Sequence, residues 1–161
     1  MRIIILFILF FAIINNTYCQ SDHVSTAKVG YIEVLSVSGP TVFTGNFDMR
    51  FHGQKGFGAH AGFGLLGSGG GGTILILPIG LNYLAGKAPH YVEAGAGATI
   101  LTIASNKYFG DAVAVFVPSA AYRYQPAANG ISIRVFVSPW VVFKGGFGAI
   151  FAGGLSVGYK F

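Results

Sequence analysis

The sequence predicts an all-β protein, an eight-stranded antiparallel up-and-down transmembrane β-barrel that follows an N-terminal signal peptide. Three observations lead to this prediction. The chain is strongly apolar, with a mean hydropathy of +0.63 and 9% charged residues. It nevertheless has no apolar run of the ~20 residues that a membrane-spanning helix needs. Alternating stretches of strand length fill most of the chain from residue 29 onward, and aromatic residues recur near the same ends of these stretches.

The N-terminal segment has the order basic, apolar, polar that defines a secretory signal peptide. Arg2 precedes an apolar run over residues 3–14, and polar residues 15–17 follow it. The run has about a dozen residues, which is too short to span a membrane as a helix. We therefore expect residues 1–19 to be removed and residues 20–161 to form a single barrel domain.

Cys19 is the single cysteine of the chain, and a retained, lipid-modified Cys19 is the alternative to cleavage. The preceding residue argues against lipidation, because Tyr18 is bulkier than the small residue expected before an acylated cysteine. If Cys19 is removed, the stability of the mature chain cannot depend on a disulfide, even in an oxidising compartment.

Turn signals and alternation with period two predict eight strands, each 10–14 residues long. Ordinary globular strands average about 5–6 residues, whereas a tilted transmembrane strand needs about 9–11. Lipid offers no hydrogen bonds, so the sheet must close and leave no unpaired edge. The predicted strands are residues 29–38, 41–52, 56–66, 73–84, 90–103, 112–124, 130–143 and 149–161.

The last predicted strand ends the chain on an aromatic residue. Leu155, Val157, Tyr159 and Phe161 share one face, and small or polar residues share the other. This pattern resembles the C-terminal assembly signal of outer-membrane β-barrels, whose final strand closes the barrel. The resemblance implies one partner, the barrel-assembly machinery. We expect deletion of Phe161 to impair insertion and Lys160→Gln to matter little.

Aromatic residues are predicted at both membrane interfaces, where an apolar ring with a polar tip matches the two sides of the boundary. If the chain starts in the periplasm, seven of the eight strands carry an aromatic residue at their periplasmic end. The predicted periplasmic set is Tyr31, Phe51, Phe57, Tyr83, Tyr91, Tyr122, Tyr124, Tyr159 and Phe161. The predicted opposite set is Phe43, Phe63, Tyr108, Phe109, Trp140, Phe143 and Phe147.

The whole mature chain resembles a small outer-membrane β-barrel of the eight-stranded type. Two runs, residues 77–83 and 121–126, are similar to uncharacterised barrel proteins of Bacteroidota. The resemblance implies an integral protein of a Gram-negative outer membrane, in contact with outer-membrane lipid and lipopolysaccharide. We expect the protein to be a monomer. We also expect it to bind no nucleic acid, because the ten Lys and Arg residues form no cluster.

Six charged residues fall inside predicted strands, and alternation points most of them toward the lumen. An unpaired buried charge is costly, so three acids and three arginines could pair in a salt-bridged polar core. Many inward positions are glycine, which leaves open a narrow water-filled path lined by the same groups. The predicted lumen network is Glu33, Asp48, Arg50, Glu93, Arg123 and Arg134. The inward glycines are Gly58, Gly62, Gly64, Gly95, Gly97, Gly154 and Gly158.

Few residues suggest chemistry. The run His23-Val24-Ser25 is similar to the His-x-Ser element of outer-membrane lipid A deacylases, but it precedes the first strand. The four histidines show no metal-ligand spacing. We therefore expect no catalytic residue, no metal and no cofactor. The expected role is structural or a minor transport of small solutes. The alternatives are a lipid-binding or lipid-modifying barrel and a soluble, secreted, ligand-binding β-barrel.

Overall fold

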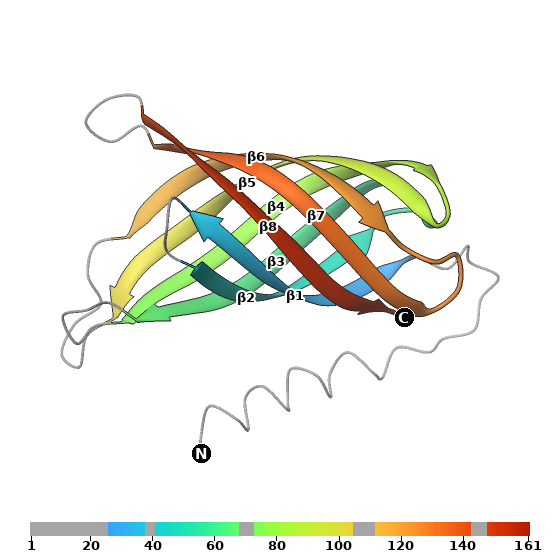
Figure 1. Ribbon diagram of the computed structural model, residues 1–161, viewed down its shortest axis with the longest axis horizontal. Helices are drawn as coiled ribbons and strands as arrows, with labels where there is room; N and C mark the ends of the chain where they lie inside the picture. The colour runs from blue at the N-terminus through green and yellow to red at the C-terminus, as the bar shows by residue number, and fades with distance from the viewer. Residues whose placement is uncertain (1–25, 38–40, 68–72, 105–111, 143–147) are drawn as a thin grey trace, which may run out of the picture.

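The alternating stretches of the sequence form eight strands in a computed structural model of the chain, which describes residues 26–37, 41–67, 73–104, 112–142 and 148–161. Each strand pairs antiparallel with its neighbour in sequence, and β1 also pairs with β8, so the sheet closes into a barrel (Figure 1). The predicted eight-stranded antiparallel barrel is therefore confirmed. The strands are β1 Lys28–Val37, β2 Thr41–Arg50, β3 Gly56–Gly67, β4 Thr73–Lys87, β5 His90–Ala104, β6 Val113–Tyr124, β7 Gly130–Val142 and β8 Gly148–Lys160.

The observed strand ends lie within three residues of the predicted ones. The largest difference is in β4, which continues to Lys87 instead of 84 because Lys87 still pairs with His90 across the turn at 88–89. In contrast, β2 ends at Arg50, since the Phe51 amide donates to the carbonyl of Phe57 at 2.9 Å and closes a turn. His52 is exposed in that turn and does not join the polar face of β2.

The two ends of the barrel differ in what they contain. Residues 51–55, 88–89 and 125–129 connect strand pairs at the end where β1 begins and the chain finishes (Figure 1). We call this the turn end; β1, β3, β5 and β7 finish at the opposite, far end. None of the described residues forms a helix long and apolar enough to cross a membrane. The predicted signal peptide, Cys19 and the His23-Val24-Ser25 run lie outside the described residues.

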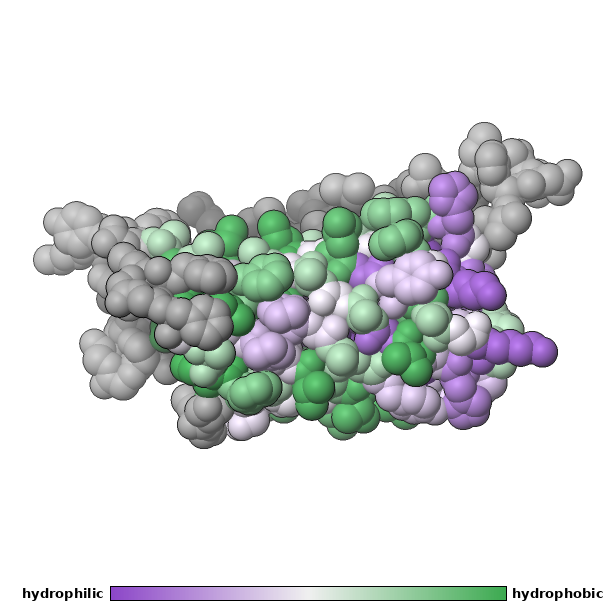
Figure 2. Space-filling model, turned by 90° about the horizontal axis from the view of Figure 1, so that it is seen from above, coloured by the Kyte–Doolittle hydropathy of each residue, from purple (hydrophilic) through white to green (hydrophobic). Residues whose placement is uncertain are grey.

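The barrel wall turns its apolar side chains outward, as the alternation predicts. Large apolar residues are exposed on all eight strands, and Phe151 reaches 75% exposure. Arg50 and Arg123 are each 2% exposed inside. Apolar side chains cover much of the face shown in Figure 2, with hydrophilic residues gathered toward the turn end. Water-soluble proteins place charged residues outside and apolar residues inside, so this barrel is inverted with respect to them.

The predicted aromatic girdle at the turn end is correct except at two positions. Exposed rings lie there on β3, β4, β6 and β8, in the turn at 51–55 and at the residue after β8: Phe51, Phe57, Tyr83, Tyr122, Tyr124, Tyr159 and Phe161. Tyr91 is only 3% exposed, and Tyr31 lines the interior cavity, so the girdle prediction is wrong for both. Each lies two residues before an inward glutamate on its strand, Glu33 or Glu93, and therefore shares its face.

The far-end aromatic prediction is correct for two of the three described residues. Phe43 and Phe63 are exposed on the outer wall. Trp140 packs against buried apolar residues of the interior, so the prediction that it belongs to an outer rim is wrong. Tyr108, Phe109, Phe143 and Phe147 lie outside the described residues.

Prolines interrupt the hydrogen-bond ladder between β6 and β7. The register runs from Phe116 opposite Val141 directly to Ala120 opposite Val137. The skipped stretch contains Pro118 and Pro139, and proline has no amide hydrogen to donate to a ladder. The Ser138 hydroxyl compensates by donating to the carbonyl of Pro118 at 2.8 Å.

One substitution tests how closely neighbouring strands approach. A Cβ added at Gly97 would collide with the backbone carbonyl of Ile79 and lie 3.0 Å from the Gly80 Cα, whereas one added at Gly45 would meet nothing within 4 Å. We expect Gly97→Ala to lower the free energy of unfolding by about 1–3 kcal/mol, the usual cost of overpacking, and Gly45→Ala to leave it unchanged. Urea unfolding of the refolded barrel in detergent measures both; equal losses would contradict the prediction.

Candidate functional site

The charged residues of the strands meet inside the half of the barrel nearer the turn end. All six predicted network residues lie in one connected series. The sign of the charge alternates at every step of this series, which therefore contains equal numbers of cations and anions. In order, the series is Arg50, Asp48, Arg123, Glu93, Arg134 and Glu33, with successive N···O distances of 2.5, 3.3, 2.6, 3.0 and 2.8 Å.

Polar side chains from three further positions complete this charged series. Asn82 donates to Asp48 at 2.6 Å and also accepts from Arg50. Ser156 donates to Glu33 at 3.0 Å. The guanidinium of Arg123 donates to Gln125 at 3.5 Å. Sequence reasoning missed Asn82 and Gln125 because it considered only charges; both are polar residues at inward positions beside apolar neighbours.

Lys160 adds a further cation at the turn end. It is 2% exposed, and its ammonium group donates to the backbone carbonyls of Pro126 at 2.8 Å and Ala127 at 2.5 Å. These bonds join the end of β8 to the turn between β6 and β7. The structure therefore gives Lys160 a stabilising role that the sequence did not indicate.

A small cavity lies beside the charged series, toward the middle of the barrel. It offers ≈ 50 Å³ to the centres of water molecules, and one water needs roughly 10–15 Å³ on that measure. The cavity can therefore hold a few waters and is far smaller than the site of a drug-sized ligand. Its lining includes Glu33 and Arg134, the polar residues Asn46, His60 and Ser119, and the apolar residues Ile76, Phe136 and Trp140.

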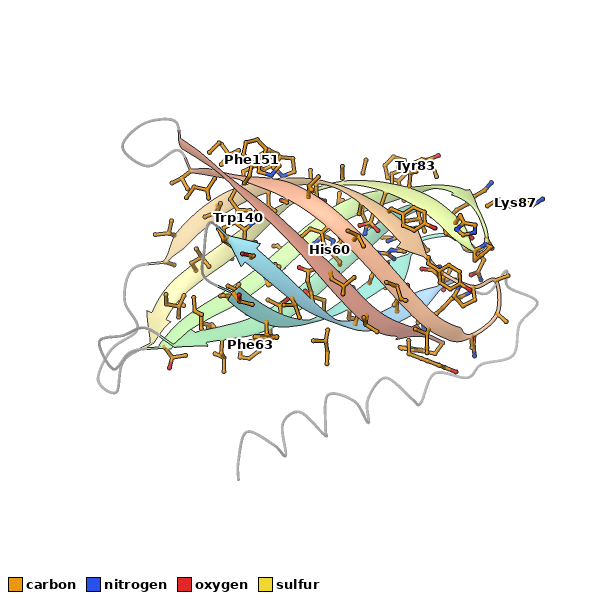
Figure 3. The ribbon with its side chains drawn as sticks, in the orientation of Figure 1. His60, Phe63, Tyr83, Lys87, Trp140 and Phe151 are labelled. Atoms are coloured by element: carbon orange, nitrogen blue, oxygen red, sulfur yellow. The ribbon has the colours of Figure 1, made fainter. Side chains whose placement is uncertain are left out.

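An apolar cluster fills the interior nearer the far end, where alternation predicts a polar lumen. Its members come from all eight strands, and Trp140 lies among them (Figure 3). Arg134 joins this cluster to the charged series, because its guanidinium lies 4.5 Å from the centre of the Phe136 ring. The cluster is Leu35, Val37, Val42, Leu66, Ile74, Ile76, Leu101, Ala121, Phe136, Trp140 and Ala152.

Several inward glycines provide the room that large interior side chains occupy. A Cβ added at Gly154 would lie 2.6 Å from the Phe136 ring, and one at Gly158 would lie 2.5 Å from the Tyr31 Cβ. At Gly58 and Gly62 an added Cβ would collide with the side chains of Arg50 and Asn46. The glycines at these four positions therefore border filled space.

The described histidines lie apart from one another. His60 faces the cavity (Figure 3), and His52 is exposed in a turn. His90 is exposed on the outer wall, where its Nδ1 lies 2.5 Å from the Tyr122 hydroxyl. Among the described residues no three His, Cys, Asp or Glu side chains gather in a way that could hold a metal ion.

The predicted assembly residues Leu155, Val157, Tyr159 and Phe161 all face outward at the end of the chain and are exposed. The Phe161 amide donates to the carbonyl of Lys28 at 3.0 Å, which extends the pairing of β8 with β1 to the last residue. The Phe161 ring lies 6.1 Å from the ring of Phe47, centre to centre.

The comparison with solved structures supports the fold. No protein-family profile matches the sequence, and no curated protein matches it. The N-terminal β-barrel domain of Pseudomonas aeruginosa OprF superposes with a TM-score of 0.55 at 13% identity, over 84% of this chain and 97% of that one. Neisserial surface protein A superposes with a TM-score of 0.55 at 11% identity, over 84% and 94%. The chain therefore has the closed eight-stranded β-barrel fold that outer-membrane barrel proteins share.

Proposed function

We propose that the protein is an integral outer-membrane β-barrel of a Gram-negative bacterium, with a closed lumen and a structural role. The inverted placement of its side chains is the observation that carries the proposal. Large apolar side chains are exposed on every strand, while Glu33, Asp48 and Glu93 lie inside. A soluble monomer rarely exposes more than a few hundred Å² of continuous apolar surface, whereas lipid requires both the apolar wall and the closed sheet.

The interior favours a structural role over solute transport. The charged series links β2, β6, β5, β7 and β1 across the half of the lumen nearer the turn end. The apolar cluster occupies the other half, and the cavity between them holds only a few waters. An eight-stranded barrel is just wide enough for its interior side chains to fill it. The polar interior residues therefore fit a filled lumen and do not require a water-filled path through the barrel.

In this setting the turn end faces the periplasm, as short connections do in bacterial barrels. The lipid-facing wall contacts outer-membrane lipid and lipopolysaccharide, and the final strand engages the barrel-assembly machinery during insertion. No enzymatic role is proposed. The similarity of residues 77–83 and 121–126 to Bacteroidota barrel proteins stays a prediction.

Membrane fractionation with heat-modifiable migration in detergent gels tests the location. We expect the full chain to remain in the outer-membrane fraction and to migrate differently before and after boiling. A closed barrel without lipid contact would stay soluble in the absence of detergent, and that result would overturn the proposal.

Planar-bilayer recording tests the closed lumen. We expect the folded protein to give no conductance steps. Replacing both Phe136 and Trp140 by Ala removes two large rings from the apolar half of the interior and leaves the charged series across the other half. This variant should therefore also stay silent while heat-modifiable migration shows a folded barrel. Steps from the unmodified protein would establish transport as the function instead.

A further inference from the structure

The side-chain charges on the outer surface of the described residues are all cationic and all lie at the turn end. Lys28 begins β1, Lys55 lies in the turn at 51–55, and Lys87 ends β4. The exposed His52 and His90 lie at the same level. The Asp and Glu side chains of the described residues lie in the lumen. Hydrophilic residues gather at this end in Figure 2, so the rim attracts anions, and none of the described Asp or Glu side chains competes with them on the outer surface.

Three residues with hydrogen-bonding side chains, Lys87, His90 and Tyr122, lie on neighbouring strands at one part of this rim. Lys87 and His90 pair directly across the turn between β4 and β5 and are both exposed. Directly paired residues present their side chains on the same face, with Cβ atoms about 4.5–5.5 Å apart. Tyr122 of β6 places its hydroxyl 2.5 Å from the Nδ1 of His90, and the Tyr124 ring packs edge-on to His90 at 5.9 Å. These contacts hold the His90 imidazole of β5 against β6.

The chemistry of this cluster fits a phosphate group. With Nδ1–H of His90 donating to the Tyr122 hydroxyl, that hydroxyl can donate to a phosphate oxygen beside the Lys87 ammonium. The tyrosine rings mark the level of lipid headgroups, and below His90 on the same face Val92 is 65% exposed on the apolar wall. A headgroup at the cluster would therefore leave its acyl chains against apolar side chains.

We propose that Lys87, His90 and Tyr122 form a binding site for the phosphate of an anionic phospholipid in the leaflet at the turn end. The site rests on the proposed membrane location and adds to it a specific lipid partner. The negative charge of an anionic lipid complements the cationic side chains of the rim. A zwitterionic lipid carries a cation beside its phosphate, which these side chains repel.

Native mass spectrometry of the full chain in detergent, titrated with phosphatidylglycerol or phosphatidylcholine, tests the site. We expect the first phosphatidylglycerol to bind more tightly than phosphatidylcholine. Lys87→Gln should weaken its binding about tenfold, which corresponds to the loss of one charge-assisted hydrogen bond. Lys87→Arg should retain the affinity, because it keeps the charge and the donors.

Lys28→Gln is the matched control, since it removes the same charge from the same rim. At least two strands separate β1 from the β4, β5 and β6 strands of the site in either direction around the barrel, so this variant should bind phosphatidylglycerol as the unmodified protein does. Equal losses in the two glutamine variants, no preference between the two lipids, or displacement of the lipid by equimolar inorganic phosphate would each overturn the site. Vesicle flotation and heat-modifiable migration of the same samples report membrane insertion separately, so failure of the location is distinguishable from failure of the site.

Discussion

Replacing Glu93 by Gln should lower the free energy of unfolding of the barrel by about 3–5 kcal/mol, the cost of removing one partner from a buried ion pair. Glu93 is 1% exposed and lies between Arg123 and Arg134, at 2.6 and 3.0 Å. Its neutralisation leaves three buried guanidinium groups with two carboxylates. Urea unfolding of the refolded barrel, followed by the fluorescence of Trp140, the single tryptophan, measures the loss.

A second substitution should restore much of that stability. Adding Arg123→Gln to Glu93→Gln removes one cation and one anion from the middle of the series. It leaves Arg50 with Asp48 at 2.5 Å and Arg134 with Glu33 at 2.8 Å, which are two complete ion pairs. We therefore expect the double variant to be more stable than Glu93→Gln alone. If it is less stable, alternation of charge is not what stabilises the lumen.

Glu33→Gln is the control for position within the series. Glu33 is the terminal member, and its side chain is 13% exposed, compared with 1% for Glu93. Neutralising it leaves Arg134 paired with Glu93 and should cost less than neutralising Glu93. A larger loss in Glu33→Gln would contradict the order of the series.

The sequence was sufficient to predict the strands and the division between wall and lumen, because both follow from alternation with period two. It was not sufficient to predict which charges pair. Asp48 meets Arg50 two residues away and Arg123 75 residues away, and Arg134 meets Glu33 across 101 residues. These partners are set by the stagger of strands around the closed barrel, which no single strand encodes.

The apolar cluster in the interior nearer the far end was not predicted, because polar and apolar residues do not alternate there. The β4 segment Thr73–Leu77 is apolar at four consecutive positions, so it offers apolar side chains to the lumen and the lipid together. Ile74 and Ile76 point inward and join the apolar cluster. Hydropathy alone cannot divide such a segment, and only the register with the neighbouring strands shows which residues are inside.

Deleting Phe161 should reduce the amount of barrel in the outer membrane severalfold, and this is the second large effect that we expect. The deletion removes the hydrogen bond from the last amide to Lys28, the ring contact with Phe47 and the final member of the outward apolar set. Phe161→Tyr keeps the backbone bond and an aromatic ring and should insert normally. Quantitative immunoblots of membrane fractions compare the two; normal levels after the deletion would contradict the assembly role of the C terminus.

Lys160→Gln separates assembly from stability at the same strand end. The ammonium of Lys160 is buried and bonded to the carbonyls of Pro126 and Ala127, and a buried polar group left unpaired costs about 1–3 kcal/mol. Because Lys160 faces inward and contributes nothing to the outward apolar set, this variant should reach normal membrane levels yet unfold at a lower urea concentration. Phe161 and Lys160 are adjacent in the chain but face opposite sides of the barrel wall. The Phe161 deletion should therefore lower the membrane level, whereas Lys160→Gln should lower the resistance to urea.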